Sequence, residues 1–149
     1  MDKNNRPLSP KNFMKIEFPS LDTNANLACT ALTAFAEQMN PTTTELDELK
    51  YIVNEAVENA IIHAYPDSIG MISIKARNLN GNILKIEVND HGLGIQNVEE
   101  ARKPCFTTGG SECSGMGFTV MESFASTMQV VSTPGKGTTV TIRYHIGQK

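Results

Sequence analysis

The chain has 149 residues, 40% of them hydrophobic, which is enough for one globular domain with a single core. Its net charge is -3 and its Lys and Arg residues are scattered, so we expect no nucleic-acid partner. The lack of an apolar run near ~18 residues and of a signal-peptide pattern predicts a cytoplasmic protein that does not enter a membrane. Residues 1–12 are polar and contain two prolines, which predicts a disordered N-terminal segment before a single domain over 13–149.

The first predicted elements of the domain are a strand and a helix. Residues 13–18 alternate between apolar and polar side chains, as in a half-buried strand. Asp22 and Thr23 offer capping groups for a helix that runs to about Met39 and is ended by Asn40-Pro41. Its expected core positions are Ala28, Leu32, Phe35 and Met39.

A longer second helix is predicted between a capping box, formed by Thr42 and Glu45, and Pro66. Apolar residues at alternating spacings of three and four predict its buried stripe, at Leu46, Leu49, Val53, Ala56 and Ala60.

Glu55 and Asn59 lie one helical turn apart on the side of this helix opposite the stripe. Two arbitrary polar residues in such a position are usually solvated. Ile52 and Ile62 flank the pair on what should be the wet face, however, which suggests the half-buried floor of a pocket.

The second half of the chain is rich in strands. A helix is predicted near Gly117–Ala125, and period-two hydropathy predicts two hairpins, formed by 72–77 with 84–89 and by 128–133 with 138–144. Because every strand is apolar on one side only, all helices must cover the same face of one sheet. We therefore expect an α/β (α+β) two-layer sandwich with one largely antiparallel mixed sheet.

The motif Asp90-His91-Gly92-Leu93-Gly94 stands where a predicted strand ends. Its glycines allow positive φ and close approach of a ligand to the backbone. An ionised, buried Asp90 would accept a hydrogen bond from a ligand N–H, such as an exocyclic amine. On its own, the motif more often marks a tight turn with an Asx cap.

Two further stretches carry chemistry. Ser114-Gly115-Met116-Gly117-Phe118 opens a predicted helix, whose backbone N–H groups would make an anion site. It is not a Walker loop, because no Lys-Ser/Thr follows the glycines. The preceding segment, Cys105–Cys113, contains Thr107 and Thr108 and has the small, polar composition of a mobile lid.

The order of these motifs resembles the ATP-binding fold shared by gyrase, heat-shock protein 90, histidine kinases and the mismatch-repair protein MutL. Within that superfamily, the chain from Phe13 onward resembles the bacterial anti-sigma factor serine kinases, above all the anti-sigma F factors of sporulating bacteria. The matching segments are 55–63, Gly94-Ile95, Glu100-Ala101-Arg102, Thr107-Thr108, 114–118 and 135–139.

The resemblance implies ATP and Mg²⁺ as cofactors and assigns roles to individual residues. Glu55 would be the general base toward a serine hydroxyl, Asn59 would coordinate Mg²⁺, and Asp90 would accept from the adenine amino group. The nucleotide site would also include Gly92, Gly94, Thr107, Thr108, Gly115, Met116, Gly117 and, beside adenine, Thr139. His63 follows the motif and is either a structural or a catalytic imidazole.

The resemblance also implies two protein partners and a homodimer. The chain would hold a sporulation sigma factor of the sigma F type inactive in an ATP-dependent manner, and would phosphorylate a serine of an anti-anti-sigma protein. The chain departs from its relatives at Cys113 and Cys29, where they carry basic residues. All three cysteines, Cys105 included, lack metal-ligand spacing and are expected to be free thiols.

Other functions on the same fold remain open. One is a general-stress-type anti-sigma kinase. Another is a histidine kinase catalytic domain or an ATPase module, which would need a further domain that we do not expect in a chain ending at Lys149. A third is an ATP-binding regulatory protein without kinase activity.

Overall fold

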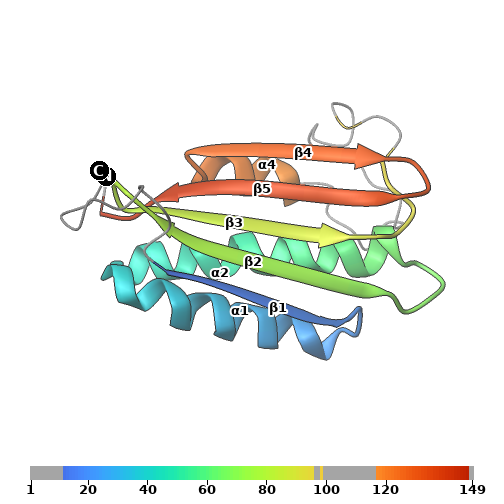
Figure 1. Cartoon of the computed structure of the whole chain (residues 1–149), viewed down its shortest axis with the longest axis horizontal. Helices are drawn as coiled ribbons and strands as arrows, with labels where there is room; N and C mark the ends of the chain where they lie inside the picture. The colour runs from blue at the N-terminus through green and yellow to red at the C-terminus, as the bar shows by residue number, and fades with distance from the viewer. Residues whose placement is uncertain (1–11, 96–97, 99–116, 148–149) are drawn as a thin grey trace, which may run out of the picture.

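Five strands form one sheet in the computed structural model, which describes residues 12–95, 98 and 117–147 (Figure 1). The strand order is β1-β2-β3-β5-β4, and all four pairings are antiparallel. The expected, largely antiparallel sheet is therefore confirmed, with no parallel pairing among the described residues, and the two predicted hairpins are confirmed as well. The strands are β1 (Asn12–Pro19), β2 (Met71–Leu79), β3 (Ile83–Asp90), β4 (Thr127–Thr133) and β5 (Gly137–His145).

In the described part of the chain, three helices cover one face of this sheet (Figure 1). They are α1 (Thr23–Ala36), which continues as the 3₁₀ turn η1 (Glu37–Met39); α2 (Thr43–Asn59), which continues as the π-helical turn η2 (Ala60–Ala64); and α4 (Gly117–Phe124). The two-layer α+β architecture is thus confirmed. No helix in the described ranges combines the length and apolarity needed to cross a membrane.

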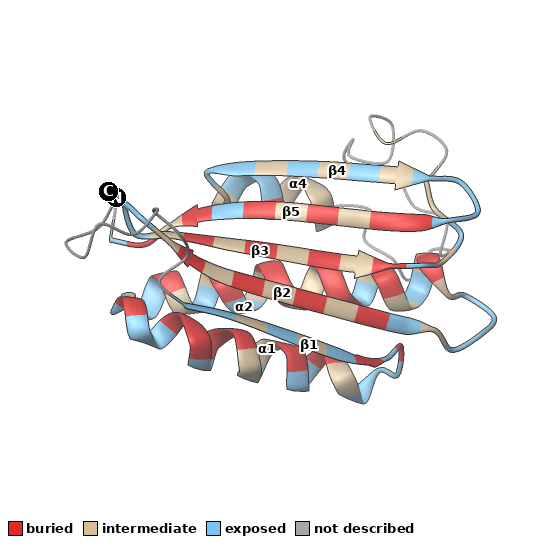
Figure 2. Cartoon of the chain, in the orientation of Figure 1, coloured by how far each residue is buried: buried red, intermediate tan, exposed pale blue. Residues whose placement is uncertain are grey.

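The strands place alternate side chains in the core, as period-two hydropathy predicts. Register aligns Ile74 of β2 with Val88 of β3 and Val140 of β5, and all three are buried between sheet and helices (Figure 2). Along each strand, the residues that alternate with the buried ones face away from the helices and are mostly polar. Which face of each strand adjoins the helices therefore follows from the sequence alone.

Three local expectations are corrected by the structure. Asn12, expected in the disordered segment, is the first residue of β1, while residues 1–11 lie outside the described part. Asp22 has helical φ and ψ and its side chain makes no capping hydrogen bond, so it does not cap α1. Ile52, expected on the wet face of α2, is fully buried, while Ile62 is exposed.

The burial of Ile52 has a structural reason. Helix α2 packs against both α1 and α4 as well as the sheet, so its buried surface is wider than one stripe. Leu46, expected in the stripe, is only half-buried, and Val57 joins Ile52 in the core.

The predicted capping box at the start of α2 is confirmed, and its Glu45 side chain also contacts the chain after β5. Glu45 Oε1 accepts from the Thr42 N–H at 2.8 Å, and the Glu45 N–H donates to Thr42 Oγ1 at 3.1 Å. The other carboxylate oxygen, Oε2, accepts from the Gly147 N–H beyond β5 at 2.7 Å. Glu45 is 2% exposed, so one buried carboxylate joins the first turn of α2 to the backbone just after β5.

We therefore expect Glu45→Ala to lower the free energy of unfolding by roughly 2–4 kcal/mol, because two backbone donors lose a buried charged acceptor. Urea denaturation followed by circular dichroism measures this loss. Thr42→Ala removes the other half of the box and should cost about 1 kcal/mol. Glu37→Ala, at an exposed glutamate, should stay within about 0.5 kcal/mol of the parent. Equal stability of the Glu45 and Glu37 variants would contradict the double role of Glu45.

Candidate nucleotide site

The end of β3 meets the end of α2 at one edge of the molecule (Figure 1). Near a helix C-terminus the backbone carbonyls have no partner within the helix. One of them, Ala64 O of η2, accepts from the Leu93 N–H at 3.1 Å and so fixes the loop that follows Asp90. The π-turn of η2 ends at a 3.3 Å bond from the Tyr65 N–H to Ala60 O.

The two glycines of the Asp90 motif are required by close packing of this loop. A Cβ on Gly92 would overlap Ala64 O, and one on Gly94 would overlap Thr133 O. Gly94 also has a φ of 77°, which side chains with a Cβ rarely adopt. The loop therefore runs between η2 and the β4–β5 turn, and both glycines contact protein backbone on these sides.

Asp90 is 6% exposed and holds the turn that follows it. Its Oδ1 accepts from the Gly92 N–H at 2.9 Å, which is the Asx turn, and from the Thr138 N–H at 3.3 Å. Burial raises the pKa of this carboxyl, and the two backbone hydrogen bonds partly offset that rise. Among the described residues Oδ2 accepts no hydrogen bond. Asp90 thus forms the turn with one oxygen and keeps an acceptor for a ligand amine with the other.

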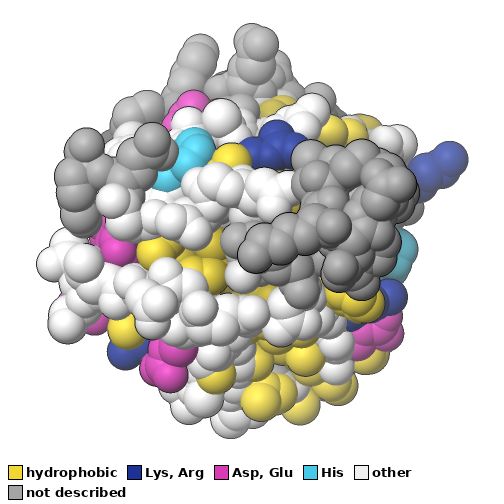
Figure 3. Space-filling view, turned by 60° about the vertical axis from the view of Figure 1, so that its left-hand side comes forward, with side chains coloured by type: hydrophobic (Ala, Val, Ile, Leu, Met, Phe, Trp, Pro, Cys, Tyr) yellow, Lys and Arg dark blue, Asp and Glu magenta, His cyan; other side chains and the backbone are white. Residues whose placement is uncertain are grey.

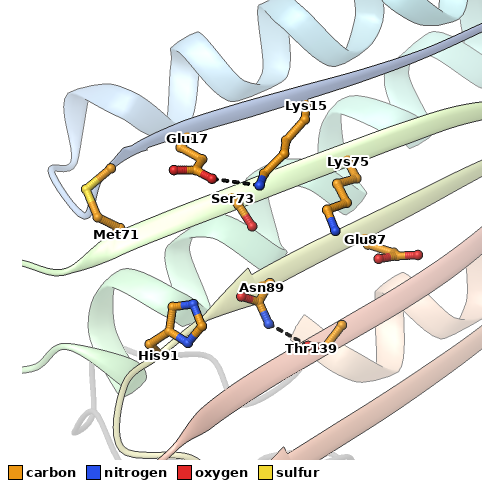
Figure 4. Close-up of a pocket in the computed structure, with 9 residues that line it drawn as sticks. All are labelled: Lys15, Glu17, Met71, Ser73, Lys75, Glu87, Asn89, His91 and Thr139. Carbon is orange, nitrogen blue, oxygen red and sulfur yellow. Dashed lines mark hydrogen bonds and ion pairs between the residues drawn. The ribbon is translucent and has the colours of Figure 1, made fainter.

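Thr139, expected beside adenine, faces the opposite side of the sheet from Asp90. Register pairs Asp90 with Thr138, whereas Thr139 pairs with Asn89 on the opposite face of the sheet. There Thr139 Oγ1 accepts from Asn89 Nδ2 at 2.6 Å (Figure 4). The threonine on the same face as Asp90 is Thr138, which is 9% exposed.

Thr138 belongs to a chain of hydrogen bonds that fixes the loop next to Asp90. Its hydroxyl is 2.8 Å from Ser132 Oγ, which also accepts from the Ile95 N–H at 2.7 Å. Gly137 allows this approach, because it has a φ of 123° and a Cβ there would overlap Asp90 O.

Glu55 and Asn59 are both half-buried at the C-terminal end of α2. Burial is the main cause that raises the pKa of Glu55, the negative charge of Glu58 adds to it, and a hydrogen bond from Tyr51 opposes it. A raised pKa makes Glu55 a better proton acceptor once it is ionised.

The residues present fit a magnesium ion that is held mainly by the phosphates of a bound nucleotide. Mg²⁺ commonly takes one or two protein oxygens and fills its other positions with phosphate oxygens and water. The Asn59 amide offers such an oxygen beside Glu55. In the part of the chain that the structure describes, no group of three or more His, Cys, Asp or Glu residues could hold a metal alone.

Other singled-out residues are placed as follows. Burial lowers the pKa of His63, which favours a neutral imidazole. The Cys29 thiol is free and donates to Lys50 O at 3.5 Å, so it faces α2. Gly117 begins α4, as predicted. Thr107, Thr108, Gly115 and Met116, together with Cys105 and Cys113, lie outside the described residues.

Tyr65 is a residue of the site that the sequence analysis missed. Its hydroxyl donates to Met71 O at 2.8 Å and accepts from the His91 N–H at 2.7 Å, so it fixes the residue after Asp90. The only sequence signal is Gly70, where a Cβ would overlap the Tyr65 ring.

A separate cleft of about 350 Å³ lies on the helix-free face of the sheet (Figure 4). Its lining includes the ion pair of Lys15 with Glu17, at 2.8 Å, and the Asn89–Thr139 hydrogen bond. Neither Glu55, Asn59 nor Asp90 lines it, so this cleft is not part of the candidate nucleotide site.

Comparison with known proteins identifies the family of this arrangement. Residues 18–144 match the model of the histidine kinase-like ATPase domain. An anti-sigma F factor of Caldanaerobacter subterraneus subsp. tengcongensis is 48% identical over 138 residues, covering 92% of this chain and 96% of that protein. One from Thermoanaerobacter sp. (strain X514) is 47% identical over 137 residues, covering 91% and 95%.

A solved structure shows the same fold. The crystal structure of the RsbU and RsbW domains of a Mycobacterium tuberculosis protein superimposes with a TM-score of 0.67. It covers 95% of this chain and 34% of that one, at 17% sequence identity.

The neighbouring threonines allow a matched test of the corrected site. Thr138→Val should weaken binding of a non-hydrolysable ATP analogue about fivefold, because a hydrogen bond that fixes the loop beside Asp90 is lost. Thr139→Val removes the same hydroxyl from the opposite face and should leave affinity unchanged. Isothermal calorimetry with Mg²⁺ present measures both. A loss confined to the Thr139 variant would restore Thr139 to the site and remove Thr138.

Proposed function

This chain belongs to the anti-sigma F factors of the histidine kinase-like ATPase domain family, and on that premise we propose that it is an ATP-dependent anti-sigma factor and protein serine kinase. It would bind and inhibit a sporulation sigma factor and phosphorylate a serine of an anti-anti-sigma protein with Mg-ATP. The observation that carries the proposal is a half-buried glutamate with a raised pKa, Glu55, one helical turn before Asn59.

The geometry supports a division of roles among the described residues. Asp90 Oδ2 would accept from the adenine amino group, and Asn59 would supply an oxygen to Mg²⁺. When bound, the ion would neutralise phosphate charge during phosphoryl transfer. Glu55 would accept the proton of the attacking serine hydroxyl. The glycine motif would contribute N–H groups through the start of α4.

Helix α1 offers a surface for the protein partners that we propose. Leu21 and Leu27, just before and on α1, are 43% and 51% exposed. Figure 3 shows hydrophobic side chains at the surface in the lower part of its view. Cys29 stands on the same helix where relatives carry a basic residue, but its thiol faces α2. We infer that apolar contact replaces part of a charged contact on this surface.

We also propose that the chain is a homodimer. A two-fold dimer needs a self-complementary surface. The helix-free face of the sheet offers such a surface, because it carries both signs of charge. It holds the ion pairs Lys15–Glu17 on β1 and Lys85–Glu87 on β3, with Lys75 of β2 between them.

Asp90→Asn should weaken binding of the ATP analogue by roughly tenfold to a hundredfold, because a hydrogen bond to a charged acceptor is lost. Burial raises the pKa of Asp90, so wild-type affinity should fall as pH decreases through that raised value and the acceptor becomes protonated. The amide that this substitution introduces does not titrate, so the affinity of the variant should lack this pH dependence. Calorimetry over a pH series measures both effects.

Asp67→Asn is the matched control, since Asp67 is exposed and remote from the motif in sequence. Unchanged affinity in Asp90→Asn, or a pH dependence equal to that of the wild type, would remove Asp90 from the adenine site.

Glu55→Gln should separate catalysis from binding. The amide keeps the shape of the side chain but cannot accept a proton, so transfer of ³²P from ATP to the anti-anti-sigma partner should fall by on the order of 10²–10⁴. Nucleotide affinity should change little. Asp47→Asn changes an exposed carboxylate near the start of the same helix and should keep the wild-type rate within about twofold.

The two ways in which this test can fail are distinct. A wild-type rate in Glu55→Gln would place the base elsewhere. No transfer by the wild-type protein, with ATP bound, would favour the ATP-binding regulatory protein without kinase activity.

A further inference from the structure

Tyr51 lies one helical turn before Glu55 on α2. Residues four apart on a helix share a face, so the tyrosine ring and the carboxylate are neighbours. The Tyr51 hydroxyl is close enough to Glu55 to lower the pKa of that carboxyl, and both residues are half-buried. Burial raises the pKa of Tyr51, so its hydroxyl stays protonated and remains a donor.

The other side of the tyrosine ring contacts α4. Its centroid is 5.7 Å from that of Phe124, with the rings perpendicular in an edge-to-face contact. Such contacts fix the orientation of an aromatic ring. Phe124 is the last residue of α4, and this helix begins at Gly117, the last glycine of the motif that would hold phosphate. Tyr51 therefore contacts both the proposed base and the proposed phosphate-binding helix.

The surroundings of Glu55 give the tyrosine a specific task. The charge of Glu58 repels the carboxylate, and the Tyr51 hydroxyl is the described group that stabilises it. The titratable groups that the packed helices carry are Cys29 on α1, whose thiol pKa the charge of Glu58 raises, and Glu122 on α4. Without a fixed donor, the glutamate side chain would sample several rotamers.

We propose that Tyr51 is a positioning residue for Glu55. Its hydroxyl donates a hydrogen bond to one carboxylate oxygen, and the contact of its ring with Phe124 fixes the position of that oxygen relative to α4. This inference rests on the proposed role of Glu55 as the general base. One oxygen accepts from Tyr51 and the other is left to accept the serine proton. The orientation of the base is then tied to the position of α4, and not to α2 alone.

Tyr51→Phe tests the proposal, because it removes the hydroxyl and keeps the ring against Phe124. We expect kcat for phosphorylation of the anti-anti-sigma partner to fall by roughly tenfold, with KM for ATP unchanged, as for loss of orientation of a catalytic group. In a Glu55→Gln background the same substitution should have no further effect, because Tyr51 acts through Glu55. An equal loss in both backgrounds would overturn the proposal.

Tyr144→Phe is the matched control. Tyr144 also donates to a glutamate of α2, Glu48 Oε1 at 2.5 Å, but near the other end of the helix. Its removal should leave kcat unchanged even if it lowers stability. Phe124→Leu keeps the Tyr51 hydroxyl and removes the ring contact, and it should lower kcat in the same direction as Tyr51→Phe. A Tyr144 variant that loses kcat as Tyr51→Phe does would mean a general effect of destabilising α2, and would overturn the proposal.

A spectroscopic arm separates this inference from the proposed kinase function. In protein labelled with ¹³C at glutamate carboxyl carbons, Glu55→Gln identifies the Glu55 resonance. At pH 8, Tyr51→Phe should shift that resonance and Tyr144→Phe should not. An unmoved resonance in Tyr51→Phe overturns the proposal even if kinase activity is present. A wild-type rate in Glu55→Gln refutes the role of Glu55 as base, whatever the resonance shows.

Discussion

The buried carboxylate of Asp90 is the interaction on which the site depends. One oxygen joins three segments, since it belongs to the end of β3 and accepts from the loop at Gly92 and from β5 at Thr138. A buried acceptor must be satisfied or it destabilises the fold, and this one is satisfied by the backbone that shapes the site. Gly137 has its unusual φ because the chain must pass so close to Asp90. Fold and ligand recognition therefore use the same side chain.

Helix α2 and the turn η2 that continues it are fixed by hydrogen bonds at both ends. At its start, Glu45 joins the capping box to Gly147, and at its end Ala64 accepts from Leu93. Between these ends it packs against α1 and α4, and its buried residues Leu49, Ile52 and Val53 share one core with the sheet. Glu55 and Asn59 are thereby held on a rigid element, which catalysis by positioning requires. The half-buried face that carries them is the part of α2 left for a ligand.

Local signals in the sequence were enough to predict most of the fold. The capping box, the alternating strands and the helix-ending Asn40-Pro41 each act within a few residues, and the structure contains all three. Burial of Ile52 was missed because it depends on α4, which is distant in sequence. Thr139 was expected at the site from the resemblance of 135–139 to the family, whereas the alternation of β5 puts Thr138, which shares a face with Val140, on the side of Asp90. The roles of Tyr65 and Tyr51 depend on Met71, His91 and Phe124, which only the fold brings together.

The strand order has a consequence for how the protein emerges during synthesis. Strands β1, β2 and β3 and helices α1 and α2 are made first, whereas β5 pairs with β3 only after about fifty further residues have been added. Until then Asp90 lacks its bond from Thr138, and the start of α2 lacks Gly147. A nascent chain on the ribosome would therefore hold a half-built sheet with an open edge at β3. The nucleotide site would be among the last features to form, and a bound nucleotide would report that translation of the sheet is complete.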